Sequence, residues 1–203
     1  LDIEGNARSI TDTCGNTAMS WKYDMLGNIC FQHSMDAGDR WMLTDVAGRA
    51  LRLWDSSQQV FSYEYDSLHR PLRLLVNTGA GDLVFGQYAY GEDVADDKLN
   101  NLRGKLYRRY DIAGLVVNEE YDFKGNCLVA TRTLLQDDKN IPDWSLAPAL
   151  STETYTEENS YDALNRLVQT VAADGSIFIP SYNAANLLND MSVRIKGADA
   201  ATA

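Results

Sequence analysis

The chain has 203 residues, 45% of them hydrophobic and 23% charged, and its 18 basic against 29 acidic residues give a formal net charge of −11. This composition excludes a disordered tail, and the acidic balance argues against nucleic-acid binding, in which Lys and Arg neutralise phosphates. No uncharged apolar run approaches the roughly 20 residues that span a bilayer, and the N-terminus lacks the basic and apolar regions of a signal peptide. Because the chain starts at Leu1, we expect a piece of a longer protein.

The residue usage favours strands joined by tight turns. There are 11 Tyr, 4 Trp and 14 Gly but only 4 Pro, and aromatic residues suit a pleated surface whereas Gly relieves the strain of turns. The sequence therefore predicts an all-β protein, built either as one large unit or as two small domains.

A short motif recurs along the chain. Five tyrosines are followed directly by Asp, and in each case the match continues for several residues. The five copies run from Tyr23 to Asn28, Tyr65 to Arg70, Tyr110 to Leu115, Tyr121 to Asn126 and Tyr161 to Arg166. Degenerate copies run from Asp2 to Asn6, Asp12 to Asn16, Asp45 to Arg49 and Tyr182 to Asn186. Several copies are 10 to 12 residues apart and others 21, which is the length of one or two strand-and-turn units.

Each position of the motif has a physical reason. Asp at the start of a turn accepts a hydrogen bond from the backbone N–H two residues on, and Gly, Asn or His three residues later adopts the left-handed conformation that reverses the chain. The preceding Tyr ends the incoming strand, where its hydroxyl reaches water or a neighbouring backbone. The predicted turn residues are Tyr23, Asp24, Gly27, Tyr65, Asp66, His69, Tyr110, Asp111, Gly114, Tyr121, Asp122, Gly125, Tyr161, Asp162 and Asn165.

Between the turns, apolar and polar residues alternate as in half-buried strands. Segments 51–53, 61–65, 72–76, 116–121 and 167–171 show this pattern, and Gly79-Ala80-Gly81 is typical of a hairpin connection. Two regions interrupt the period. Residues 86–104 contain an acidic segment that predicts a solvated loop or an irregular connection, and residues 136–159 predict an inserted loop within a single repeat segment covering 1–203.

The tandem Tyr-Asp-x-x-Gly-Asn/Arg pattern resembles the YD repeats of RHS proteins. Residues 104–126 and 161–188 are particularly similar to the B and C components of bacterial Tc insecticidal toxin complexes and to SpvB-linked RHS toxins. The resemblance covers the whole chain except the two interruptions.

This resemblance implies tandem antiparallel hairpins in a twisted sheet strip, part of a hollow shell that encloses a C-terminal toxic effector. The partners it implies are the remaining shell segments and the enclosed effector, and the localisation is secreted or cell surface. A fragment of such a strip is also expected to associate with itself through exposed strand edges. Family shells carry an autoproteolytic core with an Asp-Pro sequence; this chain has no Asp-Pro, so no protease residues are assigned.

Sites for catalysis, a cofactor or a metal are not predicted. His33 and His69 lack partners at recognisable spacing for a zinc site or a nucleophile, and the three cysteines Cys14, Cys30 and Cys127 are neither at metal-ligand spacing nor among basic residues. A catalytic carboxylate pair is needed once, whereas the Asp of the motif recurs at every turn, so a turn role is favoured over glycosidase chemistry. We therefore expect a structural, non-enzymatic segment.

The alternative is a cell-surface module that binds a glycan or a protein. Trp21, Trp41, Trp54 and Trp144 belong to a residue type that stacks on sugars, although packing of the sheet explains them more simply. Trp144 is the candidate ligand contact because it lies in the predicted insertion, where it also suits docking of that loop onto the sheet.

Overall fold

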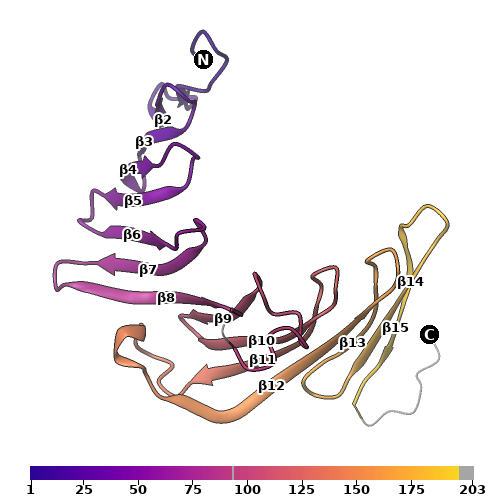
Figure 1. Ribbon diagram of the computed structural model, residues 1–203. Helices are drawn as coiled ribbons and strands as arrows, with labels where there is room; N and C mark the ends of the chain where they lie inside the picture. The colour runs from indigo at the N-terminus through magenta and orange to yellow at the C-terminus, as the bar shows by residue number, and fades with distance from the viewer. Residues whose placement is uncertain (93, 197–203) are drawn as a thin grey trace. The chain divides into compact units, whose positions relative to one another are not determined.

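The computed structural model describes residues 1–92 and 94–196, which form fifteen β-strands and one short 3-10 helix (Figure 1). The strands are β1 (Ser9–Thr11), β2 (Thr17–Tyr23), β3 (Ile29–Ser34), β4 (Gly38–Thr44), β5 (Ala50–Asp55), β6 (Val60–Tyr65), β7 (Pro71–Asn77), β8 (Asp82–Tyr90), β9 (Leu106–Asp111), β10 (Gly114–Tyr121), β11 (Cys127–Leu135), β12 (Leu150–Tyr161), β13 (Leu167–Val171), β14 (Ile177–Tyr182) and β15 (Leu188–Arg194). The 3-10 helix η1 spans Trp144–Leu146.

The sheet has the simplest topology, because each strand lies beside the strands that precede and follow it in the sequence, from β1 to β15. The strand pairs are antiparallel, and no α-helix occurs in the described part of the chain. The prediction of an all-β fold built from tandem antiparallel hairpins is confirmed. None of the described helices is long and apolar enough to cross a membrane.

The chain divides into two compact units, each described separately below. The first contains residues 1–86 with residues 142–146, and the second contains residues 87–141 and 147–203. The division falls within β8 and within the loop that follows β11, so this strand and this loop each contribute residues to both units. We expected a single repeat segment over 1–203. The strands do follow one continuous order, but the residues group into two compact units.

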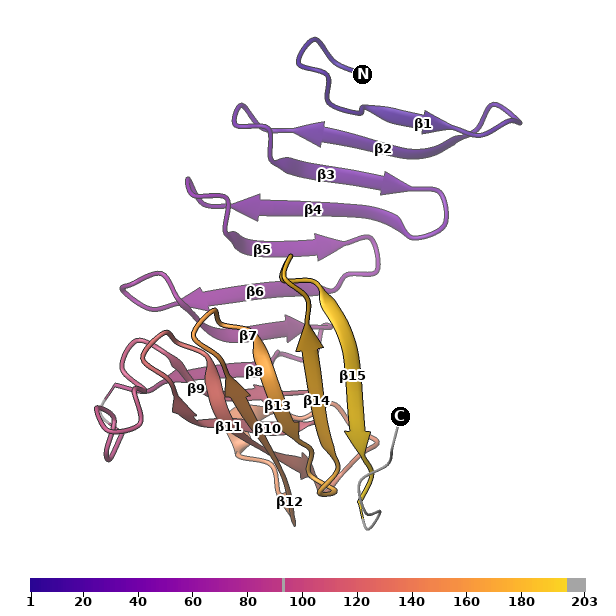
Figure 2. The same cartoon turned by 90° about the vertical axis from the view of Figure 1, so that its right-hand side faces the viewer.

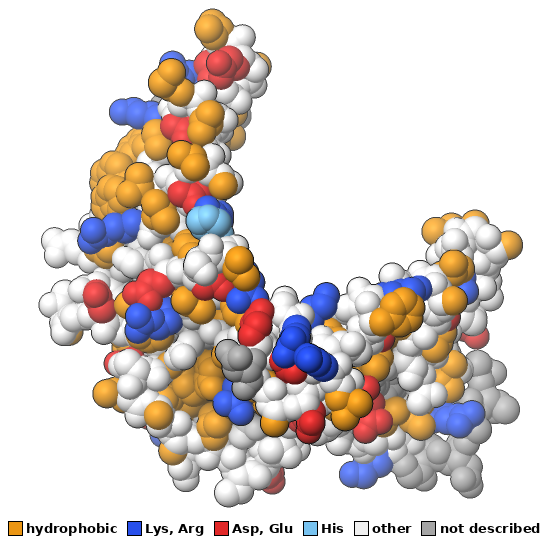
Figure 3. Space-filling view, viewed as in Figure 1, with side chains coloured by type: hydrophobic (Ala, Val, Ile, Leu, Met, Phe, Trp, Pro, Cys, Tyr) orange, Lys and Arg blue, Asp and Glu red, His pale blue; other side chains and the backbone are white. Residues whose placement is uncertain are grey.

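The first unit carries a row of aromatic rings on one sheet face. Phe31, Trp41 and Trp54 are cross-strand partners on β3, β4 and β5. The Phe31 and Trp41 ring centroids are 5.6 Å apart, and the Trp41 and Trp54 rings lie nearly parallel with centroids 6.4 Å apart. Figure 2 shows these strands stacked in chain order, and Figure 3 shows hydrophobic side chains gathered over this part of the unit. Cross-strand aromatic pairs of this kind stabilise a sheet.

The second unit contains the most buried side chain of the described residues, Leu102, which is 1% exposed. Leu102 lies in the segment between β8 and β9, which folds back on the unit. The backbone N–H of Tyr121 donates to the carbonyl of Asn100, and the side chain of Asn101 donates to the carbonyl of Tyr121. Of the predicted solvated loop or irregular connection 86–104, residues 86–90 belong to β8 instead, and the chain from there to β9 is an irregular connection in which Leu102 is buried.

The predicted insertion 136–159 is shorter in the structure. Residues 150–159 belong to the 12-residue strand β12, which pairs with β11, so only the segment between Leu135 and Leu150 is a loop. The prediction was wrong here because Thr152–Glu158 are exposed on both faces of the sheet, and a strand with no buried face lacks the alternation that marks a strand in a sequence.

Buried side chains are few for a chain of this length. Among the described residues, the hydrophobic core consists of Val84, Leu102, Tyr121 and Trp144, of which Leu102 alone is fully buried. A globular domain normally packs two layers around a core, whereas most apolar side chains of this sheet stay half-exposed.

Candidate functional site

The recurring turns are the structural feature that the sequence singled out, and the turn after β2 shows their geometry. The N–H of Asp24 donates to the carbonyl of Asn28, at 2.9 Å, and the N–H of Gly27 donates to the carbonyl of Asp24. One carboxylate oxygen of Asp24 accepts from the N–H groups of Leu26 and Asn28, at 2.8 and 2.9 Å. The Asp side chain therefore satisfies backbone donors that the reversal removes from the ladder.

The fourth position of the turn requires a left-handed backbone. Gly27 has φ 83° and Gly125 φ 96°, while His69 and Asn165 hold φ values of 64° and 63°. An Asp-x-x-Gly turn of this type leaves a bulge in the strand pair, and the register shifts at the residue before Tyr23, as it does before Tyr65. Where this position of the five full copies is not Gly, it holds His69 or Asn165, which are residue types that tolerate positive φ.

The tyrosine of the motif ties its turn to the preceding strand. The Tyr65 hydroxyl donates to the carbonyl of Ala50, at 2.7 Å, and the Tyr121 hydroxyl donates to that of Leu106, at 2.6 Å. The hydroxyls of Tyr23 and Tyr182 make the same contact with the carbonyls of Ala7 and Leu167. Each bond joins residues 15 or 16 positions apart in the sequence, so the tyrosines connect successive hairpins.

The fifth position closes the turn with a polar side chain. Asn28 and Asn126 donate an amide N–H to the second carboxylate oxygen of their Asp, whereas Arg49, Arg70 and Arg166 donate a guanidinium N–H there. Two of these arginines also lie over the tyrosine of the next turn along the same edge: the Arg166 guanidinium carbon is 4.9 Å from the Tyr182 ring centroid, and that of Arg49 is 5.7 Å from the Tyr65 ring centroid.

Consecutive turns along this edge also share direct hydrogen bonds. Asn126 donates to the side-chain oxygen of Asn165, and Arg166 donates to that of Asn186, at 3.2 and 2.8 Å. These contacts join the three turns 122–126, 162–166 and 183–187 of the second unit. These three turns, which alternate with the connections at the opposite ends of the strands, are therefore coupled to one another.

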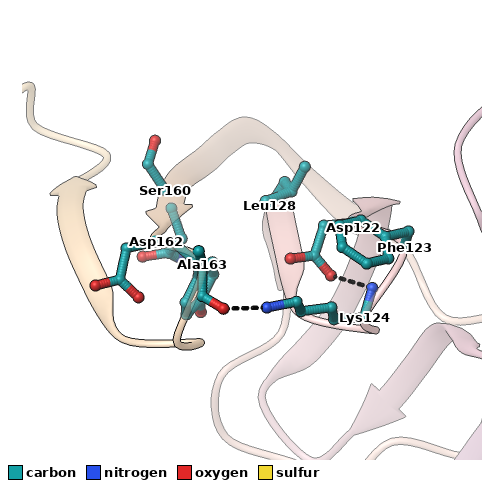
Figure 4. A pocket seen from close by; sticks show the side chains of 9 residues that line it. Asp122, Phe123, Lys124, Leu128, Ser160, Asp162 and Ala163 are labelled. Carbon is teal, nitrogen blue, oxygen red and sulfur yellow. Dashed lines mark hydrogen bonds between the residues drawn. The ribbon is translucent and has the colours of Figure 1, made fainter.

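A shallow groove of about 500 Å³ lies between two of these turns (Figure 4). Asp122, Phe123 and Lys124 line one side, and Asp162 and Ala163 line the other. The Lys124 ammonium group crosses the groove and donates to the carbonyl of Ala163. The two Asp side chains are engaged by their own turns, so the groove holds no free carboxylate pair for acid–base chemistry.

The hydrogen bonds of the turns lower the pKa of their carboxyl groups. The side-chain amide of Asn28, followed by its backbone N–H, holds the pKa of Asp24 below its ordinary value. The backbone N–H of Arg49 and then its guanidinium lower the pKa of Asp45, and the backbone N–H of Arg166 does the same for Asp162. These groups are held as carboxylates, which suits acceptors in turns rather than a general acid.

The Tyr110-Asp111 copy has a different geometry from the others. Asp111 and Gly114 are cross-strand partners around a two-residue connection, and Gly114 has φ 145° rather than the left-handed helical value. A side chain at Gly114 would collide with the backbone of Thr133 and Leu134, so Gly is required there by close approach. Asp111 still accepts from the N–H groups of Ala113 and Gly114, at 2.9 and 3.1 Å, and also from two guanidinium N–H groups of Arg132, at 2.7 and 3.1 Å.

Two turns of the same backbone form were missed from the sequence. Asp55 accepts from the N–H groups of Ser57 and Gln59, and Gln58 takes the left-handed position with φ 64°. At the other, Ala172 occupies the Asp position, and its N–H donates to the carbonyl of Ser176. Asp55 follows Trp rather than Tyr and has no Gly or Asn three residues on, and Ala172 has no carboxylate, so neither matches the motif.

The histidines and cysteines occupy separate places. His33 lies 2.6 Å from the carboxylate of Asp39, and His69 lies in a turn. All three cysteines are free, and burial raises the pKa of the Cys127 thiol, which disfavours a nucleophilic thiolate. Within residues 1–92 and 94–196, no three His, Cys, Asp or Glu side chains are grouped as a metal site.

Trp144 lies in η1 and is 7% exposed. Next to it, Asp143 accepts from the N–H of Val84 on β8, at 3.3 Å, and from the backbone and hydroxyl of Ser145. The tip of this loop is thereby attached to the first unit. With most of its ring buried, Trp144 offers little surface on which a sugar can stack.

Comparison with known proteins adds the family context. No family model matches the chain. The chain is homologous to two toxin subunits of Yersinia entomophaga: it is 28% identical to toxin subunit YenC2 over 222 residues, covering 97% of this chain and 22% of YenC2. It is 23% identical to toxin subunit YenC1 over 189 residues, covering 88% of this chain and 19% of YenC1.

Solved structures share the fold. A chain in the Photorhabdus luminescens Tc holotoxin pore structure matches with a TM-score of 0.82 and 24% identity, over 98% of this chain and 10% of that chain. The crystal structure of TcdB2-TccC3 matches with a TM-score of 0.77 and 25% identity, over 91% of this chain and 9% of that chain. The predicted resemblance to Tc toxin subunits is confirmed, and the chain spans about a fifth of the curated relatives' length.

Proposed function

We propose that this chain, a homologue of Tc toxin C-type subunits, is a wall segment of an RHS/YD-repeat toxin shell that encloses a C-terminal toxic effector. In this proposal it acts by enclosure rather than catalysis, within a secreted or cell-surface protein. Its partners are the remaining shell segments and the enclosed effector.

The observation that carries this proposal is the single-layer construction of the sheet. Strands follow one another in chain order, and the described residues bury only four large hydrophobic side chains. A sheet built in this way saturates the backbone hydrogen bonds of its inner strands without forming a closed core, which suits a wall and not a globular enzyme.

The test is the structure of the full-length protein that contains this segment, determined by electron cryo-microscopy. We expect β1–β15 to form part of a closed wall with the C-terminal effector inside. A complete protein in which these strands enclose nothing would overturn the proposal.

A protease experiment on the same protein tests enclosure in solution. The C-terminal effector should resist digestion in the wild type and become sensitive when Gly27→Val and Gly125→Val together destabilise two turns of the wall. A matched variant with Asn at both positions should keep the protection, because Asn already occupies this turn position at Asn165. Equal digestion of the effector in all three proteins would contradict enclosure.

Glycan binding is the second candidate, and the row formed by Phe31, Trp41 and Trp54 is the observation that favours it. Nearly parallel, half-buried indole rings on adjacent strands present a flat apolar surface of the kind on which sugars stack. A glycan array compares the wild type with Trp41→Ala and with Trp144→Ala. Saturable binding that is lost in Trp41→Ala would support this candidate, and silence across all sugars would reject it.

A further inference from the structure

Strand β12 has a free edge in the middle of the second unit. It has 12 residues, whereas β13 on its far side has only five, and Figure 1 shows β12 as the long strand between β11 and β13. The pairing with β13 covers only Glu158 to Tyr161. Val171, the last residue of β13, lies opposite Glu158, and the turn from Ala172 to Ser176 then leads into β14. β13 therefore does not reach the residues of β12 that precede Glu158.

Residues 154–157 therefore have a strand on one side only, and residues 151–153 lie at a register shift of the β11–β12 pair, between the partners Leu135 with Leu150 and Thr133 with Thr154. β11 pairs with Thr154 through Glu158, and within the described part of the chain no strand pairs with 152–157 on the other side. All seven residues from Thr152 to Glu158 are exposed. Backbone N–H and C=O groups alternate in direction along a strand, so about half of those in this stretch face solvent in strand geometry.

The sequence of this edge favours an added strand. Thr154 and Thr156 lie on one face and Tyr155 and Glu157 on the other, and Glu153 lies on the side of Tyr155, whose hydroxyl donates to the Glu153 carboxylate at 2.9 Å. β-branched and aromatic residues suit strand pairing. Pro, Lys and bulges are the usual devices that block an exposed edge. Residues 152–157 contain no Pro and no Lys, and the pairing with β11 is regular from Thr154 to Glu158, with the register shift confined to 151–153.

The charges of the edge select the partner. Glu153 and Glu157 flank Tyr155 on one face, and the basic residue opposite Tyr155, Arg132, is already bound to the carboxylate of Asp111. A second copy of this strand, paired antiparallel about Tyr155, would set Glu153 of one copy against Glu157 of the other. Like charges directly opposite each other destabilise a strand pair, so the edge disfavours self-association.

We propose that the free edge of β12 binds an extended polypeptide strand with Lys or Arg opposite Glu153 and Glu157 and an apolar residue opposite Tyr155. The added strand continues the line of β13 and extends the sheet by main-chain hydrogen bonds, with specificity supplied by the alternate side chains. This inference rests on the geometry of β12 and is independent of the proposed shell function.

The probe is the acetylated, amidated heptapeptide Thr-Lys-Thr-Val-Thr-Lys-Thr, whose palindromic order serves parallel and antiparallel binding alike. It is titrated into the isotope-labelled 203-residue chain, to about 2 mM, because isolated strands bind weakly. We expect saturable amide chemical-shift changes concentrated at residues 152–157. No change at 152–157 at the highest concentration would overturn the proposal.

Two controls separate strand addition from charge attraction. Two further peptides carry methyl groups on the backbone nitrogens of the odd-numbered or of the even-numbered residues. One of them should lose binding and the other should keep it, because only one set of N–H groups faces β12. Glu153→Lys combined with Glu157→Lys, both at exposed positions, should weaken binding of the Lys peptide at least about tenfold and create binding of its Glu counterpart.

The remaining outcomes count against the proposal. Binding that is equally sensitive to both methylation patterns, or insensitive to both, would show that the peptide does not add as a strand. Sedimentation experiments test for a second copy at this edge. If the wild-type chain forms a dimer and the double substitution abolishes that dimer, the occupant is a second copy instead.

Discussion

At the scale of single residues, the Asp turns combine one left-handed backbone position with one carboxylate that accepts from the backbone, and the turn at Ala172 keeps the backbone form without the carboxylate. The same turn accepts Gly, Asn, His or Gln in its left-handed position, and its closing position holds Asn, Arg or Gln. The motif varies in sequence because different side chains satisfy the same two physical requirements.

Gly27 tests the conformational requirement in isolation, because a Cβ atom built there meets no other atom within 4 Å. Gly27→Val should lower the free energy of unfolding by about 1 to 3 kcal/mol, since a β-branched residue is strained at φ 83°. Gly27→Asn is the matched control and should cost less than about 1 kcal/mol, because Asn tolerates positive φ. Urea denaturation measures both, and equal losses would reject the conformational explanation.

The carboxylates of the turns make the free energy of unfolding depend on pH. Their pKa values in the folded state lie below the value of about 3.9 of an unfolded Asp, so the stabilisation is complete above about pH 4 and is lost as the pH falls through the folded values. We expect the melting temperature to fall steeply below pH 4. A variant with Asp24→Asn, Asp45→Asn and Asp162→Asn should show a shallower fall between pH 4 and pH 2, and an unchanged slope would contradict this role.

At the scale of elements, the tyrosines join one hairpin to the next. The hydroxyl of Tyr121 both donates to the carbonyl of Leu106 and accepts from the side chain of Asn118, in a site where the Tyr121 residue is only 7% exposed. The hydroxyl of Tyr23 makes the equivalent bond to Ala7 at an exposed position. The two sites differ mainly in burial.

Tyr121→Phe should therefore destabilise the protein more than Tyr23→Phe. The first change removes two part-buried hydrogen bonds and leaves only the bond from the Asn118 amide to the Leu106 carbonyl, which costs about 1 to 3 kcal/mol, whereas in the second water replaces the lost hydroxyl and the cost is below about 1 kcal/mol. Thermal and urea unfolding of the two variants measure the difference. Equal costs would show that the tyrosine rings, and not their hydroxyls, connect the hairpins.

At the scale of the whole molecule, the order of the strands limits how far a local change is felt. Each strand contacts its neighbours in sequence, and the chain separates into two contact units. Stability in such an array is a sum of local terms and nearest-neighbour terms.

Hydrogen exchange of the Gly27→Val variant tests this organisation. Exchange should accelerate in β2 and β3 and in the strands beside them, because the altered turn joins this pair. Amides of β10 to β13 in the second unit should exchange as in the wild type. Uniform acceleration across both units would indicate that the chain unfolds as one cooperative body.

Most of the local structure was predictable from the sequence. The turn residues from Tyr23 to Gly27 and from Tyr121 to Gly125 carry their own reason for reversing the chain, because an Asx turn and a left-handed Gly act within five residues. The alternation of residues 61–65 and 72–76 likewise reports a strand with one apolar face. These features depend on neighbours in the sequence, which a sequence displays directly.

Other features were decided only by tertiary contacts. Gly114 is required because the backbone of β11 passes too close for a side chain, Leu102 is buried by its contacts in the second unit, and β12 forms a strand although Thr152–Glu158 have no buried face. The free edge of β12 exists because β13 is shorter than its neighbour, a difference that only strand register reveals. The sequence by itself determined the turns that carry the motif, because their hydrogen bonds act within five residues. The lengths and register of neighbouring strands, and the packing of the segments between them, decided which residues are buried and which edge stays open.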